Sequence, residues 1–259
     1  MITRVLTIAS SDSGGGAGIQ ADLKAFARCG AHGMSAIVAL TAQNTLGVTA
    51  IEQLPPAFVR EQIRAVLDDI GAGAAKTGML FSSAIIGAVA DELAGRDLPL
   101  VVDPVMVASS GARLLLPDAV ATLIVRLFPL ATVITPNLPE AQALTGLATE
   151  DRAALAERLV AMGAAAALVT GGHGAEPADH LFDGRRHLSI PARPCATASL
   201  ATWAARRAAS GSERPSARPA ARAAECVQPA PWVAATSYLG TGIDRWRCPS
   251  KRWSAGSAP

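Results

Sequence analysis

The chain has 259 residues, enough for one large α/β domain or two small ones. Half of the residues are hydrophobic but only 4% are aromatic, which predicts a core of Ala, Val, Leu and Ile. No apolar run is as long as the roughly 18 residues that a membrane-spanning helix needs. The N-terminus shows no charged leader followed by an apolar core. We therefore expect a cytoplasmic protein without a membrane partner, whose cysteines are thiols.

The net charge of +2 conceals two unlike segments. Residues 1–192 carry 13 Lys and Arg against 18 Asp and Glu, whereas residues 193–259 carry 10 against 3. The second segment also holds all four tryptophans, and its prolines interrupt any helical period. We expect a folded domain over 1–192 and a basic, disordered tail over 193–259. The arginines of the tail are scattered, which favours a solvated segment over one that binds nucleic acid.

Up to residue 192, short apolar runs alternate with amphipathic segments of helical length. The runs that we expect to form strands are 5–10, 35–42, 74–80, 100–107, 132–135 and 166–170. Apolar residues at helical spacing predict one helix over 59–70, ending at Gly71, and another over 86–93. This alternation predicts an α/β fold with a mostly parallel sheet between two layers of helices. Ligands of such sheets bind at the carboxyl ends of the strands.

The first expected strand runs into a glycine-rich turn, residues 13–18, and then into a helix that carries Asp22. We expect the amides of this turn to point outward towards a ligand; the alternative is a plain tight turn with Asp22 in solvent. The glycine spacing fits neither a Walker A loop nor a dinucleotide fingerprint, which disfavours an oxidoreductase. At the end of the second run, Gln43 has both a donor and an acceptor for the edge of a heterocycle.

The third and fourth runs end in Lys76, Met79 and Asp103. Lys76 is either functional or solvated, and Met79 is either a wall for a flat ring or part of the core. Asp103 interrupts an apolar run, where a carboxylate is costly unless it is paired or bound to a cation. We expect Asp103 to position magnesium or to tune a proton transfer.

The fifth and sixth runs carry polar and small residues. Asn137 is either a helix cap or a ligand. Glu140, at the start of the next helix, either favours the helix dipole or holds hydrated magnesium. The small residues from Thr170 to Gly172 suit a close approach of nucleotide phosphates, and His173 is expected to be a loop residue.

Taken together, these motifs resemble the hydroxymethylpyrimidine kinases of thiamine biosynthesis, which belong to the ribokinase-like superfamily. The segments that carry the resemblance are 13–24, 41–45, 76–80, 102–106, 135–141 and 170–173. The resemblance implies a ribokinase-like three-layer fold. It also implies phosphorylation of 4-amino-5-hydroxymethyl-2-methylpyrimidine, and then of its monophosphate, with ATP and Mg²⁺.

The resemblance further implies roles for the strand-end residues. The residues implied to bind the pyrimidine are Gln43, which reads its edge, and Gly16, Asp22, Met79 and Val105, which line the pocket. The residues implied to bind ATP and its phosphates are Asp103, Asn137, Glu140, Thr170, Gly171 and Gly172, with Asp103 and Glu140 also holding the metal. Residues 110–112 match the mobile flap of the family. Some relatives carry lysine at the position of Thr170. Without that lysine, we expect less positive charge next to the ATP phosphates here.

One segment of the family is missing. Beyond the position of residue 191 the family has a Gly-(Thr/Ala)-Gly-(Cys/Asp) motif, whose amides bind the transferring phosphoryl group and whose last residue serves the substrate hydroxyl. Cys195 lacks the flanking glycines, and the Gly-Thr-Gly-Ile-Asp run at 240–244 has no apolar helix after it. We therefore assign no catalytic residue and expect impaired turnover. A frameshift near 191–193 is our hypothesis for the change in composition.

Two alternatives remain open. One is a pyridoxal or pyridoxine kinase, against which the Thr-Ala-Gln-Asn-Thr segment at 41–45 favours the pyrimidine. The other is a catalytically dead remnant that binds the pyrimidine. A homodimer is also left open.

Overall fold

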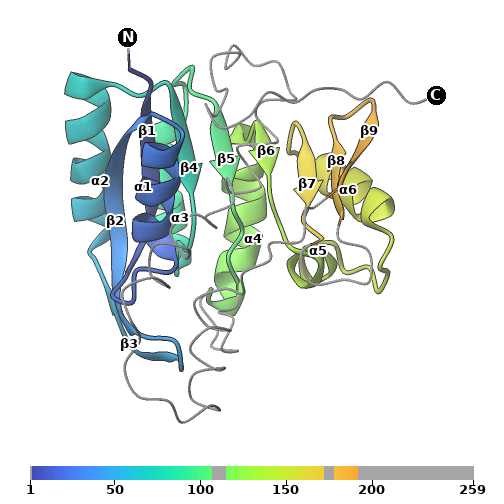
Figure 1. Cartoon of the computed structure of the whole chain (residues 1–259), viewed down its shortest axis with the longest axis horizontal. Coiled ribbons are helices and arrows are strands. Elements are labelled where there is room, and N and C mark those ends of the chain that lie inside the picture. The colour runs from blue at the N-terminus through green and yellow to red at the C-terminus, as the bar shows by residue number, and fades with distance from the viewer. Residues whose placement is uncertain (1, 107–114, 172–177, 192–259) are drawn as a thin grey trace, which may run out of the picture.

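The computed structural model describes residues 2–106, 115–171 and 178–191, and all structural statements here concern these ranges. Nine strands form one sheet (Figure 1). In spatial order they are β3 (Val48–Gln53), β2 (His32–Gln43), β1 (Arg4–Asp12), β4 (Ala74–Thr77), β5 (Leu100–Val102), β6 (Val133–Ile134), β7 (Ala167–Val169), β8 (Ala178–Phe182) and β9 (His187–Pro191). The strands from β2 to β7 run parallel, and β3, β8 and β9 join through antiparallel pairs. The mostly parallel sheet is thus confirmed, and each predicted apolar run overlaps a strand.

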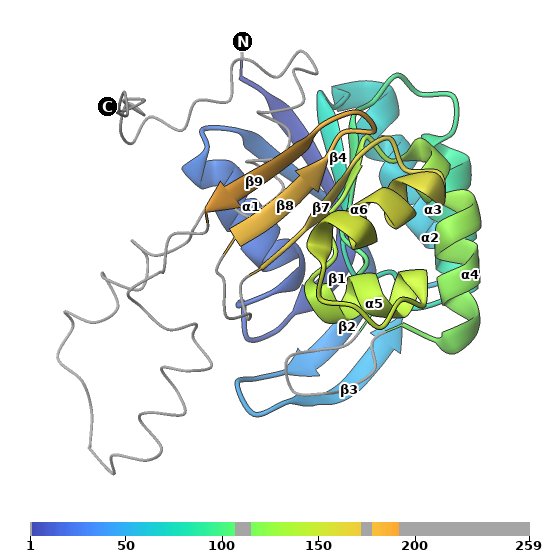
Figure 2. The ribbon, with the colours of Figure 1, turned by 90° about the vertical axis from the view of Figure 1, so that its right-hand side faces the viewer.

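Helices cover both faces of the sheet, but unequally (Figure 2). The helical segments are α1 (Gly18–Arg28), α2 (Pro56–Ala65), η1 (Val66–Ile70), α3 (Ser83–Leu93), α4 (Pro117–Arg126), η2 (Phe128–Leu130), α5 (Leu138–Thr145) and α6 (Arg152–Ala161). The larger core cluster joins one face of the sheet to α2, α3, α4, α5 and α6. The smaller cluster lies on the other face, where α1 contributes Phe26 next to Val5, Val101, Val133 and Leu168. Among the described helices, α1 is the one that supplies side chains to this smaller cluster.

The helix predicted over 59–70 changes its winding halfway along. Val59 and Ile63 of α2 are fully buried, as the apolar spacing predicts. The next five residues form the π-helical turn η1, which Gly71 closes with a bond from its amide to the Val66 carbonyl at 2.9 Å. A π turn is wider than an α turn, so the apolar face rotates away from the core. Ile70, the last apolar residue of the predicted helix, is therefore 40% exposed.

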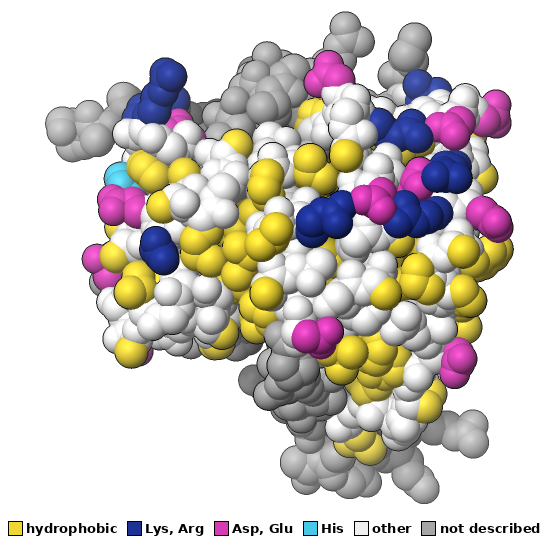
Figure 3. Space-filling view, turned by 180° about the vertical axis from the view of Figure 1, so that it is seen from behind, with side chains coloured by type: hydrophobic (Ala, Val, Ile, Leu, Met, Phe, Trp, Pro, Cys, Tyr) yellow, Lys and Arg dark blue, Asp and Glu magenta, His cyan; other side chains and the backbone are white. Residues whose placement is uncertain are grey.

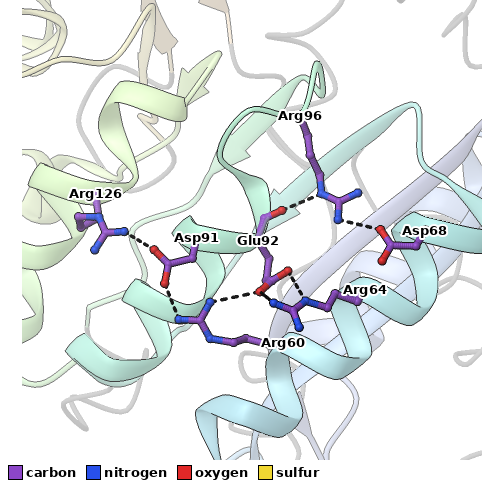
Figure 4. A network of polar contacts seen from close by, with 7 residues as sticks. All are labelled: Arg60, Arg64, Asp68, Asp91, Glu92, Arg96 and Arg126. Carbon is purple, nitrogen blue, oxygen red and sulfur yellow. Dashed lines mark hydrogen bonds and ion pairs between the residues drawn. The ribbon is translucent and has the colours of Figure 1, made fainter.

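A network of charged side chains joins α2, α3 and α4 on the outside of the larger helical layer (Figure 4). Glu92 of α3 accepts two hydrogen bonds from the Arg64 guanidinium, at 2.7 and 2.8 Å, and one from Arg60 at 3.2 Å. Arg60 also pairs with Asp91, which in turn pairs with Arg126 of α4. Basic and acidic side chains likewise lie next to one another in the upper part of the face that is seen from behind (Figure 3). These ion pairs link α2, α3 and α4 across the outer surface of this layer.

Candidate active site

The carboxyl ends of the parallel strands meet along one edge of the sheet, which we call the strand-end edge; it is the lower edge in Figure 1. From one side to the other it presents Gln43, Asp12, Lys76, Asp103, Asn137 and Thr170. Neighbouring strands lie about 4.8 Å apart, so the ends of β2 and β6 are roughly 19 Å from each other. The predicted strand-end residues therefore lie on one edge, which is long enough for two small ligands side by side.

The glycine-rich turn between β1 and α1 is organised by a carboxylate that the sequence reasoning missed. Asp12 is 5% exposed, and its side chain accepts hydrogen bonds from the amides of Gly14, Gly16 and Ala17 at 2.7, 2.9 and 2.8 Å. The expectation that the amides of this turn point outward to a ligand is wrong for these three residues. A negative charge already occupies the N-terminal end of α1, which explains why this turn does not suit a phosphate.

Glycine is needed where this turn enters α1. Gly18 has a φ of +56°, and a Cβ atom there would lie 2.4 Å from the carbonyl oxygen of Ser10. No other residue fits so close to β1 without moving the backbone. The helix that carries Asp22 is therefore held directly against the end of β1.

Gln43 lies at the end of β2, beside the glycine-rich turn. The Ser13 hydroxyl accepts a hydrogen bond from the Gln43 amide at 2.8 Å and donates one to the Gln43 carbonyl at 2.7 Å. The Thr41 hydroxyl lies 3.2 Å from the side-chain Oε1 of Gln43. The Gln43 side chain is half-buried, so its carboxamide keeps surface for a ligand.

The middle of the strand-end edge holds a buried cluster of charges. Lys76 Nζ lies 3.0 and 3.1 Å from the two carboxylate oxygens of Asp22 and 3.4 Å from Asp103 Oδ2. Thr7 donates a further hydrogen bond to Asp22 at 2.6 Å. Burial by itself would lower the pKa of the Lys76 ammonium, but Asp103 and Asp22 raise it above its usual range. The alternatives of a solvated Lys76 and a solvated Asp22 are therefore wrong.

Two carboxyl groups of the strand-end edge carry raised pKa values. Burial raises the pKa of Asp103, against the opposing effect of Lys76, and the nearby charge of Asp22 raises it further. Burial also raises the pKa of Glu140 to about 7, and the charge of Asp103 adds to this effect. Asp22 and Asp103 thus share the Lys76 ammonium group, and the charge of Asp103 also acts on Glu140, so negative charge is in excess when all three carboxyl groups are ionised.

Asn137 and Glu140 form a capping box at the start of α5. The Asn137 side chain accepts from the Glu140 amide at 2.9 Å, and Glu140 Oε2 accepts from the Asn137 amide at 2.9 Å. Glu140 Oε1 lies 3.4 Å from the amide of Met106, beyond the end of β5. The cap interpretation of Asn137 is confirmed, and the same box aims Glu140 towards the loop after Asp103.

A divalent cation fits this part of the site on charge. Asp103 and Glu140 are hard oxygen ligands, and after burial the charge of Asp103 is the next cause that raises the pKa of Glu140, an effect that a nearby cation would oppose. In the ranges that the structure describes, no group of three or more His, Cys, Asp or Glu side chains is placed to hold a metal. Two carboxylates with water and phosphate oxygens are the usual shell of Mg²⁺ in a nucleotide site.

The end of β7 provides the last part of the strand-end edge. The Thr170 amide donates to the Pro136 carbonyl at 2.9 Å, which holds it beside Asn137. At Gly171 a Cβ atom would lie 2.0 Å from the carbonyl oxygen of Ala178, so glycine is required there. The amide of Gly171 donates to Asp179 at 2.8 Å. Five of the positions discussed from the sequence lie outside the described residues: Gly172, His173, residues 110–112, Cys195 and residues 240–244.

Two residues that were predicted to line the pocket, Met79 and Val105, differ in how far their side chains are exposed. Met79 is 5% exposed, and its sulfur accepts a hydrogen bond from the Ser10 hydroxyl at 3.3 Å. Val105 is half-buried, and its amide donates to the Asp103 carbonyl at 2.9 Å. Met79 thus forms part of the floor beneath the edge, whereas Val105 keeps open surface next to Asp103.

The raised pKa of Glu140 predicts how stability depends on pH in metal-free protein. A carboxyl whose folded pKa, about 7, exceeds its unfolded value of about 4.5 favours folding below pH 4.5, and this contribution is lost as the pH rises through 7. Glu140→Gln should therefore be more stable than the parent at pH 8, by at most about 3 kcal/mol, and similar to it at pH 4.5. Urea unfolding at the two pH values measures this. Equal differences at both pH values would show that folding does not raise the pKa of Glu140.

Comparisons with known proteins point to one family. The family model described as "Phosphomethylpyrimidine kinase" matches residues 12–224. A hydroxymethylpyrimidine/phosphomethylpyrimidine kinase of Rhizobium meliloti is 50% identical over 198 residues, which are 74% of this chain and 74% of the relative. A bifunctional thiamine biosynthesis protein of Geobacter sulfurreducens is 52% identical over 186 residues, and the match spans 38% of that longer protein.

Solved structures agree with the sequence comparisons. The phosphomethylpyrimidine kinase of Clostridium difficile has a TM-score of 0.70 and 38% identity, and the match covers 92% of this chain and 99% of that one. The pyridoxal kinase of Staphylococcus aureus, in complex with AMP-PCP, has a TM-score of 0.64 and 35% identity, covering 72% and 70%. Within the described residues, no helix has the length and apolarity to cross a membrane. The fold, the strand-end motifs and these matches together show that the chain belongs to the phosphomethylpyrimidine kinase family.

Proposed function

We propose that the chain binds 4-amino-5-hydroxymethyl-2-methylpyrimidine and Mg·ATP along the strand-end edge and transfers a phosphoryl group to the pyrimidine alcohol. The observation that carries the proposal is the buried Lys76, which pairs with Asp22 on the side of Gln43 and with Asp103 on the side of Glu140. The family is one of kinases, and a solved relative is in complex with an ATP analogue, so ATP is the phosphoryl donor. Mg²⁺ and the identity of the pyrimidine are the finer parts of the proposal.

The order of the strands divides the edge between the two substrates. Gln43 and the glycine-rich turn occupy the end that we assign to the pyrimidine, and Thr170 and Gly171 occupy the end that we assign to the nucleotide. Between them, Asp103 and Glu140 would hold the metal, whose charge would neutralise the transferring phosphate oxygens. Lys76 fixes Asp22 and Asp103 in one arrangement, so the two halves of the site keep a constant spacing.

We further propose that turnover by this chain is impaired. Phosphoryl transfer depends mainly on positioning and on stabilisation of negative charge. Residues 192–259 contain no Gly-(Thr/Ala)-Gly-(Cys/Asp) motif followed by an apolar helix, so the donors that this motif supplies in the family are lost. Binding of both substrates needs the strand-end edge, whereas fast transfer also needs the missing segment.

Mass spectrometry of the products tests the function. The purified chain is incubated with Mg·ATP and either the hydroxymethyl pyrimidine or pyridoxal. The pyrimidine monophosphate should accumulate slowly and pyridoxal phosphate more slowly still, and Asp103→Asn should stop both. Faster formation of pyridoxal phosphate would favour the vitamin B6 kinase, to whose structures the chain is also similar. Binding of the pyrimidine without any product would identify a non-catalytic remnant.

A further inference from the structure

Gln43 lies at the end of β2, where its pairing with β3 is disturbed and its pairing with β1 has already ended. The β2–β3 register shifts between Ala42 and Gln43, and the last β1–β2 pair joins Asp12 to Thr41. Such irregularities turn a side chain away from the direction that a regular strand would give it. The direction of the Gln43 carboxamide therefore depends on whatever holds its backbone locally.

The Ser13 hydroxyl holds that backbone. It bonds to both the amide and the carbonyl of Gln43, at 2.8 and 2.7 Å, and so substitutes for a neighbouring strand. The glycine-rich turn also packs closely here, because a Cβ atom on Gly14 would lie 3.3 Å from the Gln43 carbonyl oxygen. A displacement of Ser13 would thus be passed directly to Gln43.

The position of Ser13 is fixed in turn by Asp12. The Asp12 side chain accepts from three amides of the turn, at Gly14, Gly16 and Ala17. The Asp12 amide donates to Gln20 of α1 at 2.8 Å, and Gln20 donates back to Ser11 at 2.7 Å. The turn is therefore tied to α1 on one side and to the end of β2 on the other.

We propose that Asp12 and Ser13 are positioning residues for substrate specificity: they hold the Gln43 carboxamide in the direction that recognises the amino group of the aminopyrimidine. The inference rests on the proposed function, since it takes Gln43 as the residue that reads the pyrimidine. Asp12 and Ser13 act through the backbone of the turn and of Gln43. The nucleotide end of the edge, beyond β4 and β5, does not depend on them.

Calorimetric titration of the full chain tests the proposal with three probes: the aminopyrimidine alcohol, its analogue without the 4-amino group, and Mg·ADP. Ser13→Ala should bind the aminopyrimidine roughly tenfold more weakly, the effect of losing one or two hydrogen bonds, and bind the deamino analogue and Mg·ADP as the parent does. Ser13→Thr, which keeps the hydroxyl, should restore the preference for the amino compound. Asp12→Asn should behave like Ser13→Ala, because a carboxamide cannot accept all three amides.

Matched controls separate positioning from general damage. Ser189→Ala removes an exposed serine hydroxyl at the opposite side of the sheet, and Asp151→Asn alters a carboxylate that caps α6 by accepting two amides. Both should bind all three probes as the parent does. If Ser13→Ala keeps the parental preference for the amino compound, or loses all three probes together, the positioning role is wrong. If the parent itself shows no preference for the aminopyrimidine, the proposed function fails first, and the inference fails with it.

Discussion

Lys76→Met should lower the free energy of unfolding by about 3–5 kcal/mol, the largest effect that we expect from one substitution. The side chains of Lys76 and Asp22 are 7% and 8% exposed, so methionine would fill the space but leave the Asp22 carboxylate buried without its cation. The hydroxyl of Thr7 remains as a partner, but one neutral hydrogen bond does not replace an ammonium group. Urea unfolding at pH 7 measures the loss.

A double variant shows whether the unpaired carboxylate causes this loss. Lys76→Met combined with Asp22→Asn removes the charge that lost its partner, so it should recover part of the stability that Lys76→Met loses. A Lys76→Met protein as stable as the parent at pH 7 would mean that the buried cluster does not exist as described.

Replacing residues 192–259 by the corresponding segment of the Rhizobium meliloti kinase should raise turnover by on the order of 10²–10³-fold. The structure gives an independent reason to expect that the segment fits. Among the described elements, α1 is the one helix that packs in the smaller core cluster. The larger cluster, on the opposite face of the sheet, contains side chains from five helices, α2 to α6. An apolar helix after β9 would complete the layer to which α1 belongs. Initial rates of pyrimidine phosphorylation measure the gain.

The chimera has a control in the strand-end edge. The same chimera with Asp103→Asn should remain slow, because the added anion hole has no correctly placed metal and phosphates to act on. If the parent chain already turns over as fast as the chimera, the impairment that we propose is wrong. Resequencing the gene around codon 192 tests the frameshift: a family-like C-terminus should appear in another reading frame.

The sequence predicted the elements whose pattern is local. Buried parallel strands are short apolar runs, and each of the six predicted runs overlaps one strand of the parallel part of the sheet: β1, β2, β4, β5, β6 or β7. The capping box of Asn137 and Glu140 could also be predicted, because its two residues are only three positions apart in the sequence. That these strand ends lie on one edge then followed from the rules for parallel sheets, whereas their order along it did not.

The features that the sequence did not predict depend on contacts between distant residues. The turn η1 changes the winding of the helix but not the spacing of apolar residues in the sequence. The exposure of Ile70 therefore cannot be predicted from that spacing. The sequence left Lys76 open between a functional and a solvated lysine, and only its contact with Asp22, 54 residues away, decides between them. Asp12 precedes a glycine-rich turn, which was the available signal, but the inward direction of the amides is a matter of backbone conformation.

The central claim is that one edge of the sheet holds two ligands at two ends. Calorimetric titration of the parent, Gln43→Ala and Glu140→Ala with the hydroxymethyl pyrimidine and with Mg·ADP tests it most directly, and Gln53→Ala on β3 is the matched control. We predict that Gln43→Ala loses the pyrimidine and keeps Mg·ADP, that Glu140→Ala does the reverse, and that the control keeps both. A parent chain that binds neither ligand, or a Gln43→Ala protein that binds the pyrimidine as the parent does, would contradict the claim.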